Sequence, residues 1–128
     1  MSRLSSGTSP LVSVILIILC LVSKEFAYAC SVNDMLIGTV RSGKEVGGQT
    51  EWIVTFTNRC SCPIENIVLS CQGFQTAEPI SQTVLKVNGG QCLLYSGTQL
   101  KAGGSLSFSY AWNSPFNLTP LNIAPMGC

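Results

Sequence analysis

Apolar and polar side chains alternate along two segments of the chain, 51–57 and 104–112. Successive side chains of a β-strand point to opposite faces, so this alternation predicts two strands with one face in the core and the other toward solvent. The faces predicted to be buried carry Trp52, Val54 and Phe56 in the first strand, and Leu106, Phe108, Tyr110 and Trp112 in the second. The opposite faces carry Glu51, Thr55 and Thr57, and Ser105, Ser107 and Ser109.

Four further segments, 35–41, 66–71, 82–87 and 91–95, are strand candidates because residues typical of turns bound each of them. These boundaries are Ser42-Gly43-Lys44, Gly47-Gly48, Asn88-Gly89-Gly90 and Ala102-Gly103-Gly104. No stretch after residue 30 keeps the 3.6-residue period of an amphipathic helix. Short strands separated by glycine-rich turns predict a small all-β domain, an antiparallel β-sandwich or a barrel-like sheet.

The N-terminal residues are organised like a secretory signal peptide. Arg3 precedes an apolar run from Leu11 to Val22, and a polar stretch follows at 23–25. The run is shorter than the roughly 20 residues that cross a bilayer, and Ala27-Tyr28-Ala29 has the small residues that signal peptidase requires. We therefore predict a signal peptide over 1–29, cleavage after Ala29, and one extracellular domain over 30–128. The alternatives are a retained membrane anchor, which needs a longer apolar run, and a bacterial lipoprotein, for which Ala27 and Tyr28 form a poor recognition sequence.

Cysteine usage agrees with export, because cleavage removes Cys20 from the seven cysteines of the chain and leaves an even number. An even set in an exported chain predicts three disulfides, which sequence alone can connect in fifteen ways. Cys60 and Cys62 are separated by one residue and are not expected to bond each other. A metal site is the alternative, but the C-x-C spacing is not that of a zinc site. The six remaining cysteines are Cys30, Cys60, Cys62, Cys71, Cys92 and Cys128.

The charged residues and the absence of histidine exclude several function classes. Without histidine there is no Ser-His-Asp or Cys-His catalytic pair and no imidazole ligand for a metal. Loss of Arg3, Lys24 and Glu25 with the signal peptide leaves equal numbers of basic and acidic residues, which disfavours nucleic acid and membrane surfaces as partners. No phosphate-binding glycine motif is present, so we expect no cofactor and no enzyme activity. A glycosidase would need a pair of carboxyl groups, here Asp34 with one of Glu45, Glu51, Glu65 or Glu78, and the sequence neither supports nor excludes such a pair.

Two aromatic residues, Trp112 and Phe116, are candidates for partner binding. They flank Asn113-Ser114-Pro115, where the second predicted strand runs into a turn. Either they complete the core, or they form an exposed pair that binds a protein or stacks on a carbohydrate. Next to them, Asn117-Leu118-Thr119 is a glycosylation sequon followed directly by Pro120, and Asn58-Arg59-Cys60 is the rare cysteine variant of such a sequon.

A set of short phrases occurs in a fixed order along the chain: 50–58 (TEWIVTFTN), 60–62 (CSC), 69–76 (LSCQGFQT), Glu78-Pro79, 92–94 (CLL), 108–112 (FSYAW), Pro115-Phe116 and Cys128. With these phrases, residues 30–128 resemble the plant tapetum determinant family. The resemblance implies a secreted, cysteine-rich ligand in the apoplast that binds the ectodomain of a leucine-rich-repeat receptor kinase, together with a co-receptor kinase, and directs anther cell fate. It implies a structural role for the six cysteines and a catalytic role for no residue. A cell-wall or carbohydrate-binding module is the alternative function.

Overall fold

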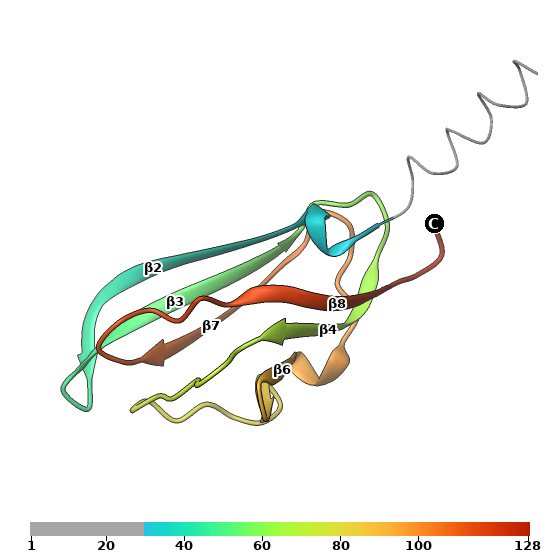
Figure 1. Cartoon of the computed structure of the whole chain (residues 1–128). Coiled ribbons are helices and arrows are strands. Elements are labelled where there is room, and N and C mark those ends of the chain that lie inside the picture. Colours follow the sequence, from blue (N-terminus) through green and yellow to red (C-terminus); the bar gives the residue numbers. More distant parts are fainter. Residues whose placement is uncertain (1–29) are drawn as a thin grey trace, which may run out of the picture.

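The computed structural model describes residues 30–128, which form two antiparallel sheets facing each other (Figure 1). One sheet has the strand order β2 (Met35–Val46), β3 (Gln49–Asn58), β7 (Ser105–Ala111). The other has the order β5 (Leu85–Asn88), β6 (Gln91–Leu94), β4 (Ile64–Ser70), β8 (Thr119–Pro125). Two short 3₁₀ helices, η1 (Val32–Asp34) and η2 (Tyr95–Gly97), complete the elements. The predicted all-β fold is confirmed, in its sandwich form. The predicted signal peptide and its cleavage site after Ala29 lie outside the described residues.

The two segments with alternating side chains form neighbouring strands, β3 and β7, as the pattern predicts. Their register places Trp52 opposite Tyr110 and Val54 opposite Phe108, so the predicted apolar faces coincide. Val54 and Tyr110 are completely buried. On the outer face, the Thr55 hydroxyl and the hydroxyl of the opposing serine lie 3.1 Å apart, which adds a cross-strand hydrogen bond.

Strand β2 is longer than the predicted segment 35–41. The sequence Ser42-Gly43-Lys44, predicted to end it, lies inside the strand as a bulge, where the register to β3 shifts between Arg41 and Glu45. Gly43 has a φ of +92°, which glycine adopts without strain and which lets the strand continue past the extra residues. The hairpin turn itself is Gly47-Gly48, as predicted; both residues have positive φ, as a two-residue turn between twisted strands requires.

Strand β8 was not predicted, because Pro120 and Pro125 interrupt its apolar pattern. It pairs only with β4, at the edge of the sheet, where a missing proline N–H removes no bond to a second neighbour. The other strands follow the predicted segments with shifted ends. The segment 82–87 contributes only β5 from Leu85 onward, because 82–84 form a turn, and 91–95 ends at Leu94, because Tyr95 turns into η2 with a φ of +48°.

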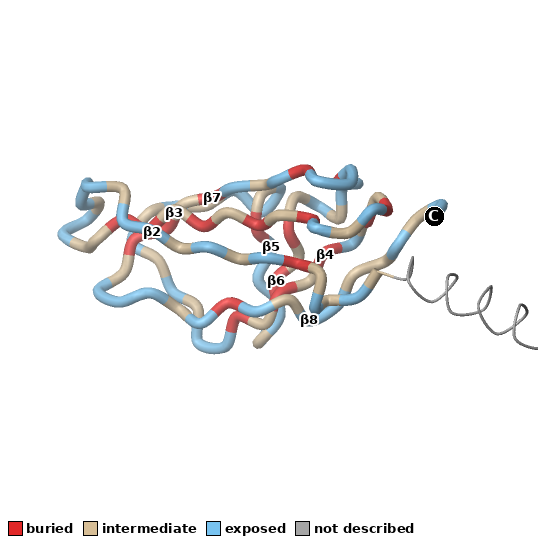
Figure 2. The backbone as a smooth tube through the Cα atoms, turned by 90° about the horizontal axis from the view of Figure 1, so that it is seen from above, coloured by how far each residue is buried: buried red, intermediate tan, exposed pale blue. Residues whose placement is uncertain are grey.

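The core lies between the two sheets, where Figure 2 shows most of the buried positions. β3 and β7 supply aromatic and branched residues from one side, and β4 and β6 supply aliphatic ones from the other. The largest completely buried side chains are Tyr110, Phe56, Ile64, Ile67, Leu69, Leu94 and Val54. No helix within residues 30–128 is long and apolar enough to cross a membrane.

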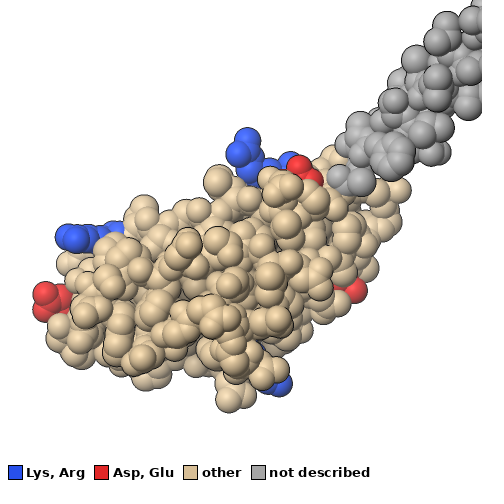
Figure 3. Space-filling model, viewed as in Figure 1, with Lys and Arg blue, Asp and Glu red and all other residues tan. Residues whose placement is uncertain are grey.

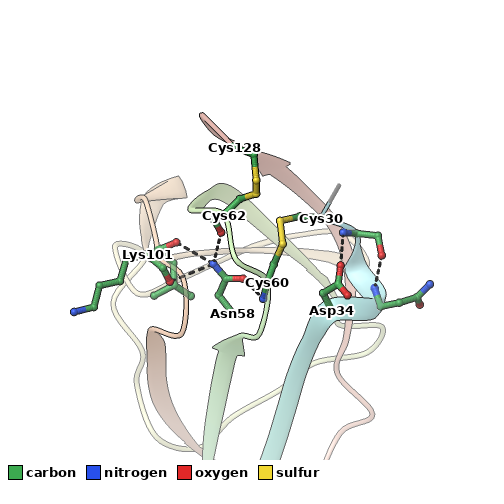
Figure 4. The surroundings of a disulfide bond; sticks show 10 residues. Cys30, Asp34, Asn58, Cys60, Cys62, Lys101 and Cys128 are labelled. Carbon is green, nitrogen blue, oxygen red and sulfur yellow. Dashed lines mark hydrogen bonds between the residues drawn. A yellow bond between two sulfur atoms is a disulfide. The ribbon is translucent and has the colours of Figure 1, made fainter. Parts of the chain in front are cut away.

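The six cysteines form three disulfides, with Cα atoms 5.2 to 6.0 Å apart. Cys30 pairs with Cys60 and Cys62 pairs with Cys128, so both ends of the described chain are attached to the loop that follows β3 (Figure 4). The third disulfide joins Cys71, directly after β4, to a position within the adjacent strand β6. Each disulfide restricts the unfolded chain, which stabilises a domain of this size by about 2–4 kcal/mol.

Candidate partner-binding site

An aromatic cluster lies at the end of β7, far along the sheet from the cysteines that hold the chain ends. Tyr110 is its buried centre, and the Phe74 ring meets it edge-on with centroids 5.2 Å apart. Phe116 packs against both, at 5.7 Å from Tyr110 and 5.2 Å from Phe74. Trp112 stacks on the outer side of Phe116, with centroids 6.4 Å apart and ring planes inclined by 28°. The cluster therefore consists of one buried ring, that of Tyr110, surrounded by partly exposed rings.

The backbone of Trp112 is held by two hydrogen bonds to β3. Its N–H donates to the carbonyl oxygen of Thr50 at 3.0 Å, and its own carbonyl oxygen accepts from Nε1 of Trp52 at 3.1 Å. Trp52 is itself buried, and the Arg41 guanidinium lies 5.4 Å from its ring centroid, a cation–π contact. Trp112 thus extends β7 by one position as a fixed, partly buried residue.

Phe116 is fixed by the hydroxyl of Tyr110. Its backbone N–H donates to that hydroxyl at 2.8 Å, while the buried Leu118 anchors the end of the loop. The sequence left open whether Trp112 and Phe116 belong to the core or to a surface pair. Both rings pack against the core and both remain partly exposed, so Trp112 and Phe116 lie at the margin of the core.

Removing the Tyr110 hydroxyl is expected to loosen this loop. Burial raises the pKa of Tyr110, so the phenol is neutral and donates or accepts hydrogen bonds at every physiological pH. Tyr110→Phe leaves the Phe116 N–H without its acceptor and should lower the free energy of unfolding by about 1 kcal/mol. Urea unfolding measures this change. A value indistinguishable from wild type would mean that water replaces the hydroxyl at no cost.

Asn117 and Asn58, the two sequon positions, differ in accessibility. Asn117 is exposed, so its glycosylation stays a prediction that intact-mass measurement would test. Asn58 is completely buried, and Cys60, the third residue of its sequon, is disulfide-bonded. The side-chain amide of Asn58 is therefore not available to a glycosyltransferase in the folded protein.

Of the five carboxylates in the described chain, Glu51 and Glu78 come together. Glu51 was predicted to face solvent, and this is wrong: it is only 6 % exposed. Glu51 does lie on the predicted outer face of β3. Segment 76–78, however, crosses the free edge of β7 and covers the end of this outer face; it is attached there by Ala77 N–H, which donates to the Ala111 carbonyl oxygen at 2.8 Å. Asp34 serves instead as a local cap, accepting the Ser31 N–H at 2.9 Å.

The sulfur atoms of Cys30, Cys60 and Cys62 lie within 4.8 Å of one another. Thiolates in such a group have the spacing of metal ligands, but a metal requires them reduced. Each of the three is part of a disulfide here, so the group acts as a covalent junction between the loop after β3 and the two chain ends.

Charged side chains are sparse on the face that carries β8. Figure 3 shows Lys, Arg, Asp and Glu near the ends and margins of that face, with uncharged side chains between them. An uncharged surface next to partly exposed aromatic rings is suited to contact by shape and apolar burial more than by charge. The fold and these features define a class: a small β-sandwich, rich in cysteine and held by disulfides, with an aromatic surface at one end.

Comparison with known proteins specifies the class further. The family model described as "Tapetum determinant 1, C-terminal" matches residues 31–126, so the chain belongs to the tapetum determinant family, as its sequence phrases predicted. It is thus a cysteine-rich, disulfide-bonded plant protein of the tapetum determinant type.

Two curated relatives come from Arabidopsis thaliana. The uncharacterized protein At1g05835 is 38% identical over 72 residues, which cover 54% of this chain and 57% of the relative. TPD1 protein homolog 1 is 28% identical over 102 residues, which cover 77% of this chain and 55% of the relative. The matches therefore span a little over half the length of each relative. No solved structure matches the chain.

Proposed function

We propose that the protein is a secreted signalling ligand that binds the ectodomain of a plant leucine-rich-repeat receptor kinase, with a co-receptor kinase, and acts in cell-fate specification during anther or other reproductive development. The observation that carries the proposal is family membership over residues 31–126. The three disulfides fit it, because they persist in the oxidising extracellular space. So does the predicted signal peptide over 1–29.

The contact surface that we propose is the aromatic pair Trp112 and Phe116. Binding energy at protein interfaces concentrates in a few aromatic or arginine side chains that are desolvated on docking. These two rings are partly exposed and stack on each other, and hydrogen bonds hold the backbone of both residues, so little conformational freedom is lost when a partner covers them. The chain has no histidine, and segment 76–78 covers Glu51, one of the two carboxyl groups that come together among residues 30–128. Both observations favour a binding role over a catalytic one.

A pull-down against a panel of leucine-rich-repeat receptor ectodomains tests this proposal. The oxidised protein should bind one of them, and Trp112→Ala with Phe116→Ala should weaken that binding by about 2 kcal/mol or more. Leu36→Ala with Val40→Ala is the matched control, because both residues are exposed apolar side chains of β2, away from the aromatic cluster. Binding that is lost equally in both double variants would contradict the assigned surface.

A carbohydrate-binding function is the second candidate, and the stacked rings of Trp112 and Phe116 are the observation in its favour. Aromatic faces pack against the apolar faces of sugar rings. Insoluble cell-wall polysaccharides in the same pull-down separate the two functions. Retention on polysaccharide with no ectodomain bound would overturn the ligand proposal.

A further inference from the structure

Two hydrogen bonds, one to the carbonyl oxygen and one from the N–H of Ala111, attach segment 76–78 to the free edge of β7. Ala77 N–H donates to the Ala111 carbonyl oxygen at 2.8 Å, and Ala111 N–H donates to Thr76 Oγ1 at 3.0 Å. Thr76 is held in turn, since its hydroxyl donates to the Glu78 carbonyl oxygen at 2.8 Å. This arrangement carries the Glu78 side chain onto the outer face of the sheet, where Glu51 lies.

The Glu78 carboxyl group is only half satisfied by protein donors. Its Oε2 accepts from the Ser109 hydroxyl at 3.0 Å. Its Oε1 is buried and has no hydrogen-bond donor among the described residues. A buried carboxylate oxygen without a donor is costly, and such an atom calls for an explanation.

Few other groups face the carboxyl pair. From β2, the Ser42 hydroxyl hydrogen-bonds with Glu51, and Lys44 Nζ lies 4.0 Å from Glu51 Oε1. The Lys44 side chain is 74% exposed, so water screens its charge. From β7 the neighbour is the neutral hydroxyl of Ser109. Lys44 thus lowers the pKa of both carboxyl groups, but its charge is the smallest of the effects on Glu78.

We propose that Glu51 and Glu78 share a single proton, and that the hydrogen bond formed by this proton holds segment 76–78 against the edge of β7. We call this hydrogen bond the latch; it is closed when the proton is bound. Two ionised carboxylates in contact repel each other, whereas one proton between them makes a charge-assisted hydrogen bond. That bond gives Glu78 Oε1 the partner it otherwise lacks. Loss of the proton restores the repulsion and opens the segment.

The titration of the pair sets the pH range of the latch. Burial raises the pKa of Glu78, and the neighbouring Glu51 raises it further; hydrogen bonds from Ser42 and Glu78 lower the pKa of Glu51. A raised carboxyl pKa contributes stability at low pH that is lost as the pH rises through it, and a lowered pKa contributes stability that is lost as the pH falls through it. The closed latch is therefore most stable in acid solution, around the ordinary pKa of 4.5, and opens as the pH rises.

The latch also bears on the aromatic cluster, and this step rests on the function proposed above. Phe74 is separated from segment 76–78 by one residue and packs against the Phe116 ring at a centroid distance of 5.2 Å. Opening the segment releases that support. Acid pH would then favour the ordered form of the partner-binding surface.

Backbone hydrogen exchange of the oxidised protein, expressed from the full-length sequence and measured without any partner, tests the latch. Between about pH 5 and pH 8, the protection factors of the Ala77 and Ala111 amides, corrected for intrinsic exchange, should fall by about tenfold or more. Glu78→Gln should abolish this pH dependence, because its amide donates to Glu51 at every pH. Glu45→Gln is the matched control: Glu45 is exposed on the same hairpin, so this variant should keep the wild-type pH dependence.

A wild-type protection factor that stays constant with pH, or a pH dependence that persists in Glu78→Gln, would overturn the latch. If that variant does not fold, NMR titration of the wild-type side-chain carboxyl carbons decides. A shared proton gives two well-separated steps, and two ordinary titrations near 4.5 would overturn the proposal. Since no partner is present, failure here is distinct from failure of the receptor-binding proposal.

Discussion

Removal of the disulfide between Cys62 and Cys128 is expected to lower the free energy of unfolding by about 4 kcal/mol. This bridge closes the longest loop of the three, with a sequence separation of 66 residues. The entropy that a cross-link removes from the unfolded chain grows with the length of the loop it closes. Cys62→Ala with Cys128→Ala, followed by urea unfolding, measures the effect. Since a domain has only about 5–15 kcal/mol of stability, the variant should be close to unfolding.

The disulfide between Cys30 and Cys60 is the matched control for that experiment. It joins the opposite end of the described chain to the same loop, but its sequence separation is 30 residues. Its removal by two alanines should cost about 0.7 kcal/mol less, from the logarithmic dependence on loop length. If the variant without Cys30 and Cys60 is clearly less stable than the variant without Cys62 and Cys128, loop entropy does not determine how much these disulfides stabilise the fold.

The second large effect is expected at Asn58, whose buried side-chain amide links two loops (Figure 4). Its Nδ2 donates to the carbonyl oxygens of Cys62 at 2.9 Å and of Leu100 and Lys101 at 3.2 Å, while its Oδ1 accepts the Cys60 N–H at 3.0 Å. Asn58→Ala removes the acceptor of the Cys60 N–H and one donor from each of the three carbonyl oxygens, of which those of Leu100 and Lys101 keep a backbone donor. It should lower the free energy of unfolding by about 3 kcal/mol.

Two further variants separate this network from a general effect of losing an amide. Asn122→Ala removes an exposed asparagine of β8 and should change stability by less than about 0.5 kcal/mol. Asn58→Asp keeps the shape but directs a carboxylate at three carbonyl oxygens, so it should be less stable at neutral pH than in acid. An Asn58→Asp protein as stable as wild type at neutral pH would contradict this account.

The strands that alternation predicts best are those that turn one whole face to the core. β3 and β7 each present one face to the core, so burial imposes a two-residue period, and Val54 and Phe108 lie in register as that period requires. β8 has no such requirement, because none of its residues is fully buried, and its exposed Leu121 and its prolines obscure any period. The β2 bulge escaped prediction because Ser42-Gly43-Lys44 is as typical of a strand end as of a bulge.

Long-range contacts account for what the sequence left open at the candidate sites. Alternation placed Glu51 on the outer face of its strand, yet its burial depends on segment 76–78, which is distant in sequence and has no periodic signal. Disulfide connectivity is likewise a matter of which loops meet, so spacing could exclude only the Cys60–Cys62 pair. Trp112 and Phe116 were found because aromatic residues flanked a turn, but their margin position depends on Phe74 and Tyr110 beneath them.

Because Cys30 and Cys128 are both attached to one loop, the two ends of the domain differ: one holds the ends of the described chain and the other holds the aromatic cluster. That loop follows Asn58, whereas Trp112 bonds to Thr50 at the other end of the same strand, eight residues earlier and about 26 Å away at roughly 3.3 Å per residue. A tag, a fluorophore or a surface linker joined to the backbone carboxyl group of Cys128, which leaves the disulfide intact, would therefore lie at the end of the domain opposite the aromatic cluster. A protein immobilised in this way would offer its aromatic end to solution.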